Sequence, residues 1–317
     1  MNPLLDFLST GDLARESLDA ILAQANGAEP ALASGAMGGC LIQSAFIGES
    51  TRTRAALELS AHTLGAPVRD VSAAALSVLR TDDAARALAR MAEAGDVLAI
   101  RHPFAPGRGH RLLEQVAELT DRPIVNLQSD LDHPLQTLAD LLTMQTHFEG
   151  ALAGRRVALT WVAQPSADRG ASIVKGLIEL LPRFGMEVRV AAPPGFELGS
   201  KSTHVQHTSD LDEALSNAEV VYPWSYAPDA LLHRPDELAA LAAPFAHWTI
   251  DERRFARAAG HAIVLSPLPG ELGPRLAPSI AGSTAVRFRQ QATARQAVLT
   301  AVLTACLAAR VQRESNR

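Results

Sequence analysis

The sequence predicts an α/β protein made of two doubly wound parallel-sheet domains joined by helices. Apolar runs of strand length alternate with longer stretches that carry apolar residues at helical spacing, the pattern of a parallel sheet covered by helices. This alternation pauses near residue 148 and then restarts, and 317 residues are enough for two domains of ordinary size. We therefore expect a first domain over 1–148, a second domain over 149–290 and a C-terminal segment over 291–317.

Individual elements follow this alternation along the chain. In the first domain, Ala and Leu at helical spacing dominate 10–93, strand-like runs occur at 40–47 and 96–100, and a helix closes the domain at about 140–148. The second half repeats the pattern, with strands predicted at 156–161, 187–191 and 219–222 and helices at 171–184, 209–216 and 293–310. Because ligands lie beyond the carboxyl ends of parallel strands, we expect a second-domain site in the loops after Trp161, Tyr222 and Leu265.

Composition excludes several classes of protein. Hydrophobic residues make up 47% and charged residues 20%, which is typical of a globular chain, and the net charge of −5 argues against nonspecific nucleic-acid binding. No apolar run approaches the roughly 20 residues of a membrane span, and the N-terminus lacks the basic start and apolar core of a signal peptide. We expect a cytoplasmic protein with neither a nucleic-acid nor a membrane partner. Cys40 and Cys306 have no metal-ligand spacing, so we expect buried free thiols and no metal.

The segment Ser50-Thr51-Arg52-Thr53-Arg54 packs two cations and three hydroxyls directly before an apolar-periodic stretch. A hydroxyl-rich helix start offers hydroxyl groups, backbone N–H groups and the positive end of the helix dipole to an anion. Two guanidinium groups at that end are unfavourable unless an anion accompanies them. The segment therefore predicts a phosphate site. The alternative is a solvated, Arg-rich helix start with an ordinary Ser cap.

Three further polar residues stand where side chains can reach a cleft. His133 and Gln136 lie at the start of a predicted helix whose Leu138, Leu141 and Leu142 share one face. Arg101 directly follows the apolar run 97–100. The alternatives are a turn histidine before a proline and a surface charge at a strand end.

Together these segments resemble the aspartate/ornithine carbamoyltransferase family, whose signature is Ser-x-Arg-Thr-Arg followed later by His-Pro-x-Gln. The similarity extends to Leu5-Asp6-Phe7-Leu8, to Arg101, to Pro267-Leu268-Pro269 and to Gln291-Ala292 followed by Arg295. It implies a carbamoyl-phosphate domain, an acceptor domain and a C-terminal helix that packs back on the first domain. The implied reaction moves a carbamoyl group from carbamoyl phosphate to an amine, with no metal or organic cofactor.

The resemblance also implies roles for these residues. Arg101, His133 and Thr53 match the donors to the carbonyl oxygen, where charge develops during attack, and each such donor is typically worth roughly 3 kcal/mol of barrier. Gln136 and the backbone carbonyl of Leu268 would orient the carbamoyl NH2 group. The full carbamoyl-phosphate set implied by the resemblance is Ser50, Thr51, Arg52, Thr53, Arg101, His133, Gln136 and Leu268.

The second-domain motif indicates an unusual acceptor. It reads Ser266-Pro267-Leu268-Pro269, without the Cys of ornithine enzymes or the His of aspartate enzymes. The segment 159–165 and the strand end 220–222 followed by Trp224 are similar to N-acylornithine carbamoyltransferases, although Gln164 replaces a His and Pro223 a basic residue. Candidate acceptors are an N-acylornithine, ornithine or a related diamino acid such as diaminopropionate. The expected acceptor-binding residues are Trp161, Trp224, Ser225, Ser266, Pro267 and Arg295. The alternative for Trp161 is a core position.

The resemblance implies a homotrimer in which the loop 73–84 completes the neighbouring subunit's site. This loop lacks the family's lysine, and Arg80 is its only cation; the alternative is a solvated charge. A second functional hypothesis is a catalytically inactive, family-shaped protein that binds a phosphorylated or amino-acid ligand. The missing His of the second-domain motif motivates it, and the intact first-domain set argues against it.

Overall fold

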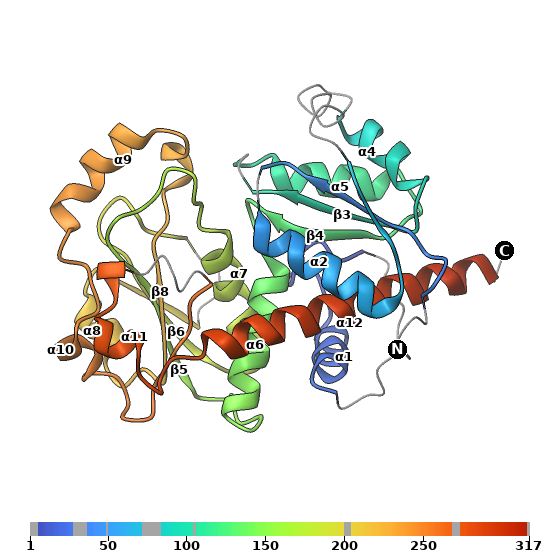
Figure 1. The fold of residues 1–317 in the computed structure, drawn as a ribbon. Coiled ribbons are helices and arrows are strands. Elements are labelled where there is room, and N and C mark those ends of the chain that lie inside the picture. Colours follow the sequence, from blue (N-terminus) through green and yellow to red (C-terminus); the bar gives the residue numbers. More distant parts are fainter. Residues whose placement is uncertain are drawn as a thin grey trace. The chain divides into compact units, whose positions relative to one another are not determined.

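A computed structural model shows two parallel sheets flanked by helices, so the predicted fold class is confirmed (Figure 1). It describes residues 6–27, 37–48, 50–71, 84–103, 106–199, 204–267 and 273–315. The chain divides into two compact units. Unit 1 comprises Met1–Leu142 and Thr293–Arg317, and unit 2 comprises Thr143–Ala292.

Unit 1 contains a four-stranded sheet in the order β2-β1-β3-β4, and all its described pairings are parallel. Its strands are β1 (Ile42–Phe46), β2 (Val68–Asp70), β3 (Val97–His102) and β4 (Ile124–Ser129). Its described helices are α1 (Arg15–Ala25), α2 (Thr51–Leu64), α4 (Ala84–Ala92), α5 (Gly109–Glu118), the first part of α6 (Pro134–His147) and most of α12 (Phe288–Ser315). The sequence analysis did not single out β2 or β4.

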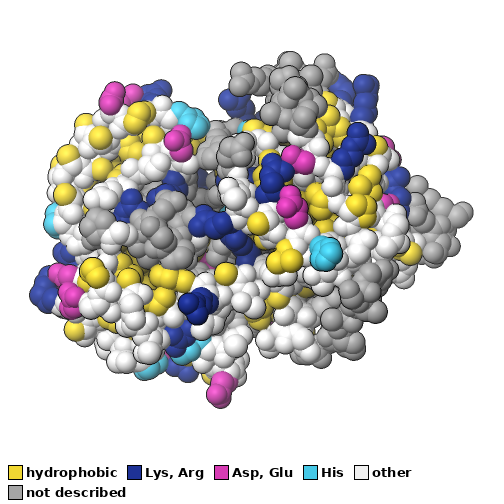
Figure 2. All heavy atoms as spheres, in the orientation of Figure 1, with side chains coloured by type: hydrophobic (Ala, Val, Ile, Leu, Met, Phe, Trp, Pro, Cys, Tyr) yellow, Lys and Arg dark blue, Asp and Glu magenta, His cyan; other side chains and the backbone are white. Residues whose placement is uncertain are grey.

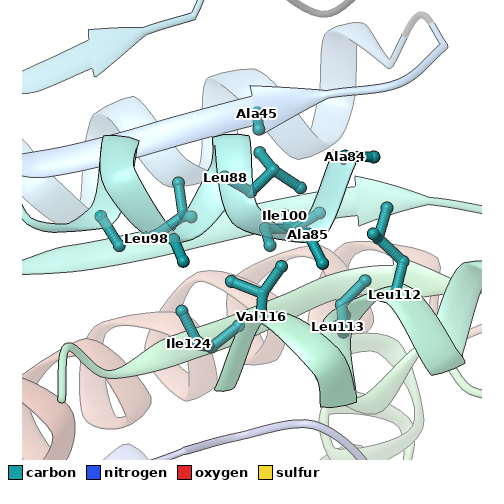
Figure 3. Packing of buried hydrophobic residues seen from close by; sticks show 12 residues of the cluster. Ala45, Ala84, Ala85, Leu88, Leu98, Ile100, Leu112, Leu113, Val116 and Ile124 are labelled. Carbon is teal, nitrogen blue, oxygen red and sulfur yellow. The ribbon is translucent and has the colours of Figure 1, made fainter. Parts of the chain in front are cut away.

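The core of unit 1 forms where α4 and α5 cover the sheet (Figure 3). Leu88 of α4 and Leu113 of α5 meet Leu98 and Ile100 of β3, and all four side chains are fully buried. Burying one such side chain stabilises the fold by about 1.5–3 kcal/mol. This packing holds β3 in place up to Ile100. Arg101, the next residue, therefore follows a well-packed part of the strand.

The C-terminal helix α12 belongs mostly to unit 1. The Ser60 hydroxyl of α2 donates to the backbone carbonyl of Gln296 at 3.3 Å, and Arg310 forms an ion pair of 3.0 Å with Asp96 just before β3. The helix is longer than the predicted 293–310. By length and composition, Phe288–Arg313 could cross a membrane, which the sequence analysis did not expect, but 61% of its apolar window is buried, and buried core helices pass the same test.

Unit 2 contains a five-stranded sheet in the order β7-β6-β5-β8-β9, with β5 at its centre. Its strands are β5 (Arg156–Trp161), β6 (Glu187–Ala191), β7 (Val205–Thr208), β8 (Val220–Trp224) and β9 (Ile263–Val264), and its α-helices include α7 (Ser172–Leu180), α8 (Leu211–Leu215), α9 (Pro235–Ala242), α10 (Glu252–Phe255) and α11 (Pro278–Ala281). The predicted helix 171–184 is α7 followed by a 3-10 turn that contains Pro182. The predicted helix 209–216 is shorter, because Asp210 caps it by accepting two backbone N–H groups.

Candidate active site

The start of α2 has the geometry of an anion site. Gly48, in the turn before it, has a φ of 93°, a left-handed conformation that residues with a Cβ rarely adopt. The Ser50 hydroxyl does not cap the helix; it donates to the Thr53 hydroxyl at 2.9 Å, and the first turn contains no acidic side chain. The alternative of an ordinary Ser cap is therefore wrong. The positive end of the helix and a pair of hydroxyl groups lie together, as a phosphate site requires.

The two arginines of this segment have different surroundings. Arg54 forms an ion pair of 2.7 Å with Asp70, and its guanidinium carbon lies 4.3 Å from the ring centre of Phe46. Asp70 also accepts a hydrogen bond of 2.7 Å from Ser44. Arg54 thus braces β1 and β2. Arg52, on the exposed side of the first turn, is the guanidinium of this segment that can serve a phosphate.

A strand irregularity directs Arg101. The register between β3 and β4 shifts between Ile100 and Arg101, and such a bulge changes the direction of a side chain. The guanidinium donates to the backbone carbonyl of Gly48 at 3.2 Å and to the Gln128 side-chain oxygen at 3.0 Å. Arg101 is only 7% exposed, so the alternative of a surface charge is wrong. Its bond to Gly48 connects it to the turn that starts α2.

His133 is buried and electrically neutral. It lies directly before Pro134, the first residue of α6, and is 5% exposed. Burial and, to a lesser degree, three guanidinium groups lower the pKa of its imidazole well below the usual 6.5. These groups belong to Arg295, Arg101 and Arg52. A neutral imidazole carries one N–H, so His133 can donate a hydrogen bond at neutral pH but is a poor proton donor.

Gln136 contacts Arg295, so this arginine lies near the predicted carbamoyl-phosphate residues. Its amide oxygen accepts a hydrogen bond of 3.4 Å from Arg295, and its amide NH2 donates to Asp140 at 2.7 Å. Burial and the charge of Arg52 lower the pKa of Arg295, while Asp140 opposes this effect. The sequence analysis expected Arg295 among the acceptor-binding residues. The structure places its guanidinium against Gln136 of the expected carbamoyl-phosphate set in unit 1, and its acceptor-binding role stays a prediction.

Sequence reasoning missed the residue that anchors the turn before His133. Asp132 is buried, and one of its carboxylate oxygens accepts three hydrogen bonds from Ser9 and Thr10. In the sequence, the signal for the role of Asp132 was its position directly before His133, a predicted site residue. Its partners are more than 120 positions away, so no local pattern reveals them.

In unit 2, Trp161 is a core residue. It is 1% exposed, its indole N–H donates to the Tyr226 backbone carbonyl at 3.0 Å, and its ring lies 4.4 Å from that of Phe196 and 6.1 Å from that of Trp248. Its indole N–H already has a protein partner, and its ring packs against Phe196 and Trp248. The expectation that Trp161 contacts an acceptor is therefore corrected to its alternative, a core position.

Trp224 and Ser225 lie at the end of β8. The Trp224 indole nitrogen is buried and has no hydrogen-bond partner among the described residues, while the Arg169 guanidinium lies 5.1 Å from the ring centre. The Ser225 hydroxyl donates to the Ala163 carbonyl at 3.4 Å. Trp224 thus offers a buried N–H beside a cation, and Ser225 ties β8 to the loop after β5.

That loop, 163–169, lines a cavity of about 870 Å³ together with α9 and Arg275. Arg169 and Arg275 supply positive charge, and the α9 side contributes Leu238 and several alanines. Gln164 has a φ of 64°, a strained value for this residue type, and Arg275 donates to its carbonyl at 2.6 Å. The sequence analysis predicted a ligand site in this loop but named neither arginine.

Other expected positions are less completely described. Ser266 is buried in unit 2, and its backbone N–H donates to the Gln291 side-chain oxygen at 2.9 Å. Pro267 is partly buried. Leu268 and Arg80 lie outside the described residues.

Two family models match most of the chain. The model described as the carbamoyl-P binding domain of aspartate/ornithine carbamoyltransferase covers residues 5–146, and its Asp/Orn binding domain covers 155–306. The chain belongs to the aspartate/ornithine carbamoyltransferase family. The resemblance drawn from the sequence motifs is confirmed.

Similar carbamoyltransferases differ in their named activities. The putative carbamoyltransferase YgeW of Escherichia coli is 30% identical over 220 residues, which are 62% of this chain and 56% of that protein, so the match spans little more than half of this relative. The aspartate carbamoyltransferase catalytic subunit of Gluconobacter oxydans is 33% identical over 84% of this chain and 83% of its own. A crystal structure of N-acetyl-L-ornithine transcarbamylase has a TM-score of 0.84 at 23% identity, covering 95% and 99% of the two chains, and so shows a shared fold.

The described residues of this chain contain no group of three or more His, Cys, Asp or Glu side chains that could hold a metal. Both cysteines are free, but only Cys306 is buried; Cys40 is partly exposed, unlike the expectation. On the face drawn in Figure 2, the described basic side chains form separate groups with acidic ones among them.

Proposed function

We propose that this carbamoyltransferase moves the carbamoyl group of carbamoyl phosphate to a primary amine of an amino acid and releases phosphate. One observation carries the proposal: Arg52, Arg101 and Arg295 lie near enough to the neutral His133 for their charges to lower its pKa. Asp140 offsets part of this positive charge, and the positive end of α2 adds to it, so the group suits an anionic ligand. A phosphorylated donor with a carbonyl group supplies both the charge and the hydrogen-bond acceptor.

Each part of the donor has a partner of suitable chemistry. The phosphate would bind the start of α2 and the Arg52 fork. Arg101, His133 and the Thr53 hydroxyl would donate to the carbonyl oxygen, whose negative charge grows as the amine attacks. The amine nitrogen bonds to the carbonyl carbon, the bond from that carbon to the phosphate oxygen breaks, and the departing phosphate takes the amine proton. A free amine with a pKa of about 10.4 is mostly protonated at neutral pH, so the site must bind or generate its neutral form.

The acceptor we propose is an N-acylornithine, ornithine or a related diamino acid. The cavity in unit 2 supports this choice, since Arg169 and Arg275 suit a carboxylate and the α9 side suits an aliphatic or acyl chain. A structural neighbour, an N-acetyl-L-ornithine transcarbamylase variant, is described in complex with carbamyl phosphate and N-succinyl-L-norvaline. We further propose a cytoplasmic homotrimer.

A phosphate-release assay tests the proposal. Purified protein receives carbamoyl phosphate and one amine from a panel of N-acetylornithine, ornithine, diaminopropionate and aspartate, and the carbamoylated amine is identified by mass spectrometry. At a carbamoyl-phosphate concentration below the wild-type KM, Arg52→Ala should lose most of the activity, whereas Arg54→Ala, a change in the same segment, should keep most of it because Arg54 pairs with Asp70. Carbamoyl-phosphate binding without turnover on any amine would support the inactive, ligand-binding alternative. Absence of carbamoyl-phosphate binding would overturn the proposed reaction.

A further inference from the structure

A buried carboxylate lies one helical turn after Gln136. Asp140 of α6 is fully buried, and it accepts the hydrogen bond from the Gln136 amide NH2 at 2.7 Å, a length typical of a charge-assisted bond. On its other side, the Gln136 amide oxygen accepts from Arg295 of α12. Gln136 is 3% exposed, so little water is available to replace either partner.

Only one orientation of the Gln136 amide satisfies both neighbours. A guanidinium can only donate hydrogen bonds, and an ionised carboxylate can only accept them. Turning the amide by 180° would place its NH2 group against the donors of Arg295 and its oxygen against the acceptor oxygen of Asp140, which is unfavourable for both contacts. Asp140 and Arg295 therefore fix the amide oxygen on the side of the cation cluster around His133.

We infer that Asp140 is a positioning residue, which aims the Gln136 oxygen at the amino group of the donor and makes the site select a carbamoyl group over other acyl groups. The inference rests on the proposed function. A carbamoyl group offers N–H donors to this oxygen, whereas an acetyl group offers only a methyl. Bound acetyl phosphate would leave the buried oxygen with a poorer set of partners, which disfavours it.

A purely electrostatic role for Asp140 predicts a different result. If Asp140 served only to offset the charge of Arg295, its removal would change the binding of every anion, including inorganic phosphate. If Asp140 acts through Gln136, its removal changes the preference between two phosphates of equal charge. The ratio of two affinities therefore separates the roles.

The test measures binding of carbamoyl phosphate, acetyl phosphate and inorganic phosphate to the full chain by calorimetry, without acceptor. We expect wild type to bind carbamoyl phosphate at least about tenfold more tightly than acetyl phosphate. Asp140→Asn should reduce this ratio about fivefold or more while inorganic phosphate binding stays within about twofold, because an Asn lets the Gln136 amide turn. Gln136→Met should reduce the ratio similarly, and the double variant should add nothing further. Asp96→Asn, which removes the carboxylate paired with Arg310 elsewhere in unit 1, is the matched control and should leave the ratio unchanged.

A second measurement needs no substitution at Asp140. In wild type, the Gln136 side-chain amide protons, assigned by their loss in Gln136→Met, should exchange slowly with solvent before and after carbamoyl phosphate binds. Fast exchange, an unchanged ratio in Asp140→Asn or additive effects in the double variant would overturn the inference. Failure of wild type to bind carbamoyl phosphate would instead overturn the proposed function, so the two failures are distinguishable.

Discussion

The backbone N–H and the hydroxyl of Thr10 both donate to one carboxylate oxygen of Asp132, each at 2.9 Å, across 122 positions of sequence. The same turn is closed by a 2.8 Å bond from the Ser129 N–H to the Asp132 carbonyl. His133 is the next residue. Thr10 therefore anchors the turn directly before His133 and helps to position the His133 imidazole.

The first prediction concerns this attachment. Thr10→Val removes the hydroxyl donor, keeps the backbone donor, and should lower the free energy of unfolding by about 1 kcal/mol, the typical net contribution of a hydrogen bond. Urea unfolding measures the change. Thr63→Val is the control, because the Thr63 hydroxyl lies exposed on α2 and donates to the Leu59 carbonyl. Equal losses in both variants would contradict the role of the Thr10 contact.

A second prediction is that Arg52→Ala and His133→Ala fail differently. Arg52 serves the phosphate, which is charged before and during the reaction, so its loss should weaken carbamoyl-phosphate binding by about tenfold or more. His133 serves the oxygen on which charge grows, so its loss should lower kcat by about a hundredfold with a smaller change in affinity. Steady-state kinetics and direct binding separate the two. Equal loss of kcat with unchanged binding in both variants would remove this division of roles.

Third, carbamoyl phosphate should bind and stabilise the fold without any acceptor. The described members of its proposed site all belong to unit 1. At a hundredfold excess over Kd, linkage gives about 2.7 kcal/mol of stabilisation, seen as a rise in Tm. Arg52→Ala should show a much smaller rise at the same concentration. An unchanged wild-type Tm at saturating ligand would show that the phosphate site is wrongly assigned.

The fourth prediction concerns pH. The folded pKa of His133 lies well below 6.5, so between these values the unfolded chain binds more protons than the native one, and stability falls as pH drops below about 6.5. His133→Asn should flatten this part of the curve of unfolding free energy against pH. NMR can follow the ring directly: among the ten histidines, the resonance missing in His133→Asn should still report a neutral ring at pH 6. A normal titration near 6.5 would contradict the buried, neutral assignment.

The fifth prediction concerns assembly. If Arg80 completes a neighbouring subunit's site, mixing an Arg80→Ala chain with an Arg52→Ala chain should restore activity at a carbamoyl-phosphate concentration at which each alone has little. Some sites then draw both intact residues from different subunits. Light scattering should show a trimer. A fully active monomer, or an Arg80→Ala enzyme with unchanged kinetics, would exclude the shared site.

The sequence predicts the parts of the site whose chemistry is local. Ser50 to Thr53 are consecutive, and the character of a helix start depends on residues within one turn. The direction of Arg101 was not predictable, since it depends on a register shift between two strands. Trp161 was misassigned because its surroundings come from distant segments that contribute Phe196 and Trp248. The contact of Arg295 with Gln136 was not predictable for the same reason, because the two residues are 159 positions apart.

The helix α12 also has a consequence for synthesis of the protein. Unit 1 is translated first up to Leu142, yet Arg295 and the Gln296 carbonyl that receives Ser60 follow all of unit 2 in the sequence. While the chain is still on the ribosome, the unit that emerges first therefore lacks one of its three site guanidinium groups and the helix beside α2. The proposed carbamoyl-phosphate site therefore acquires Arg295 only after unit 2 has been synthesised.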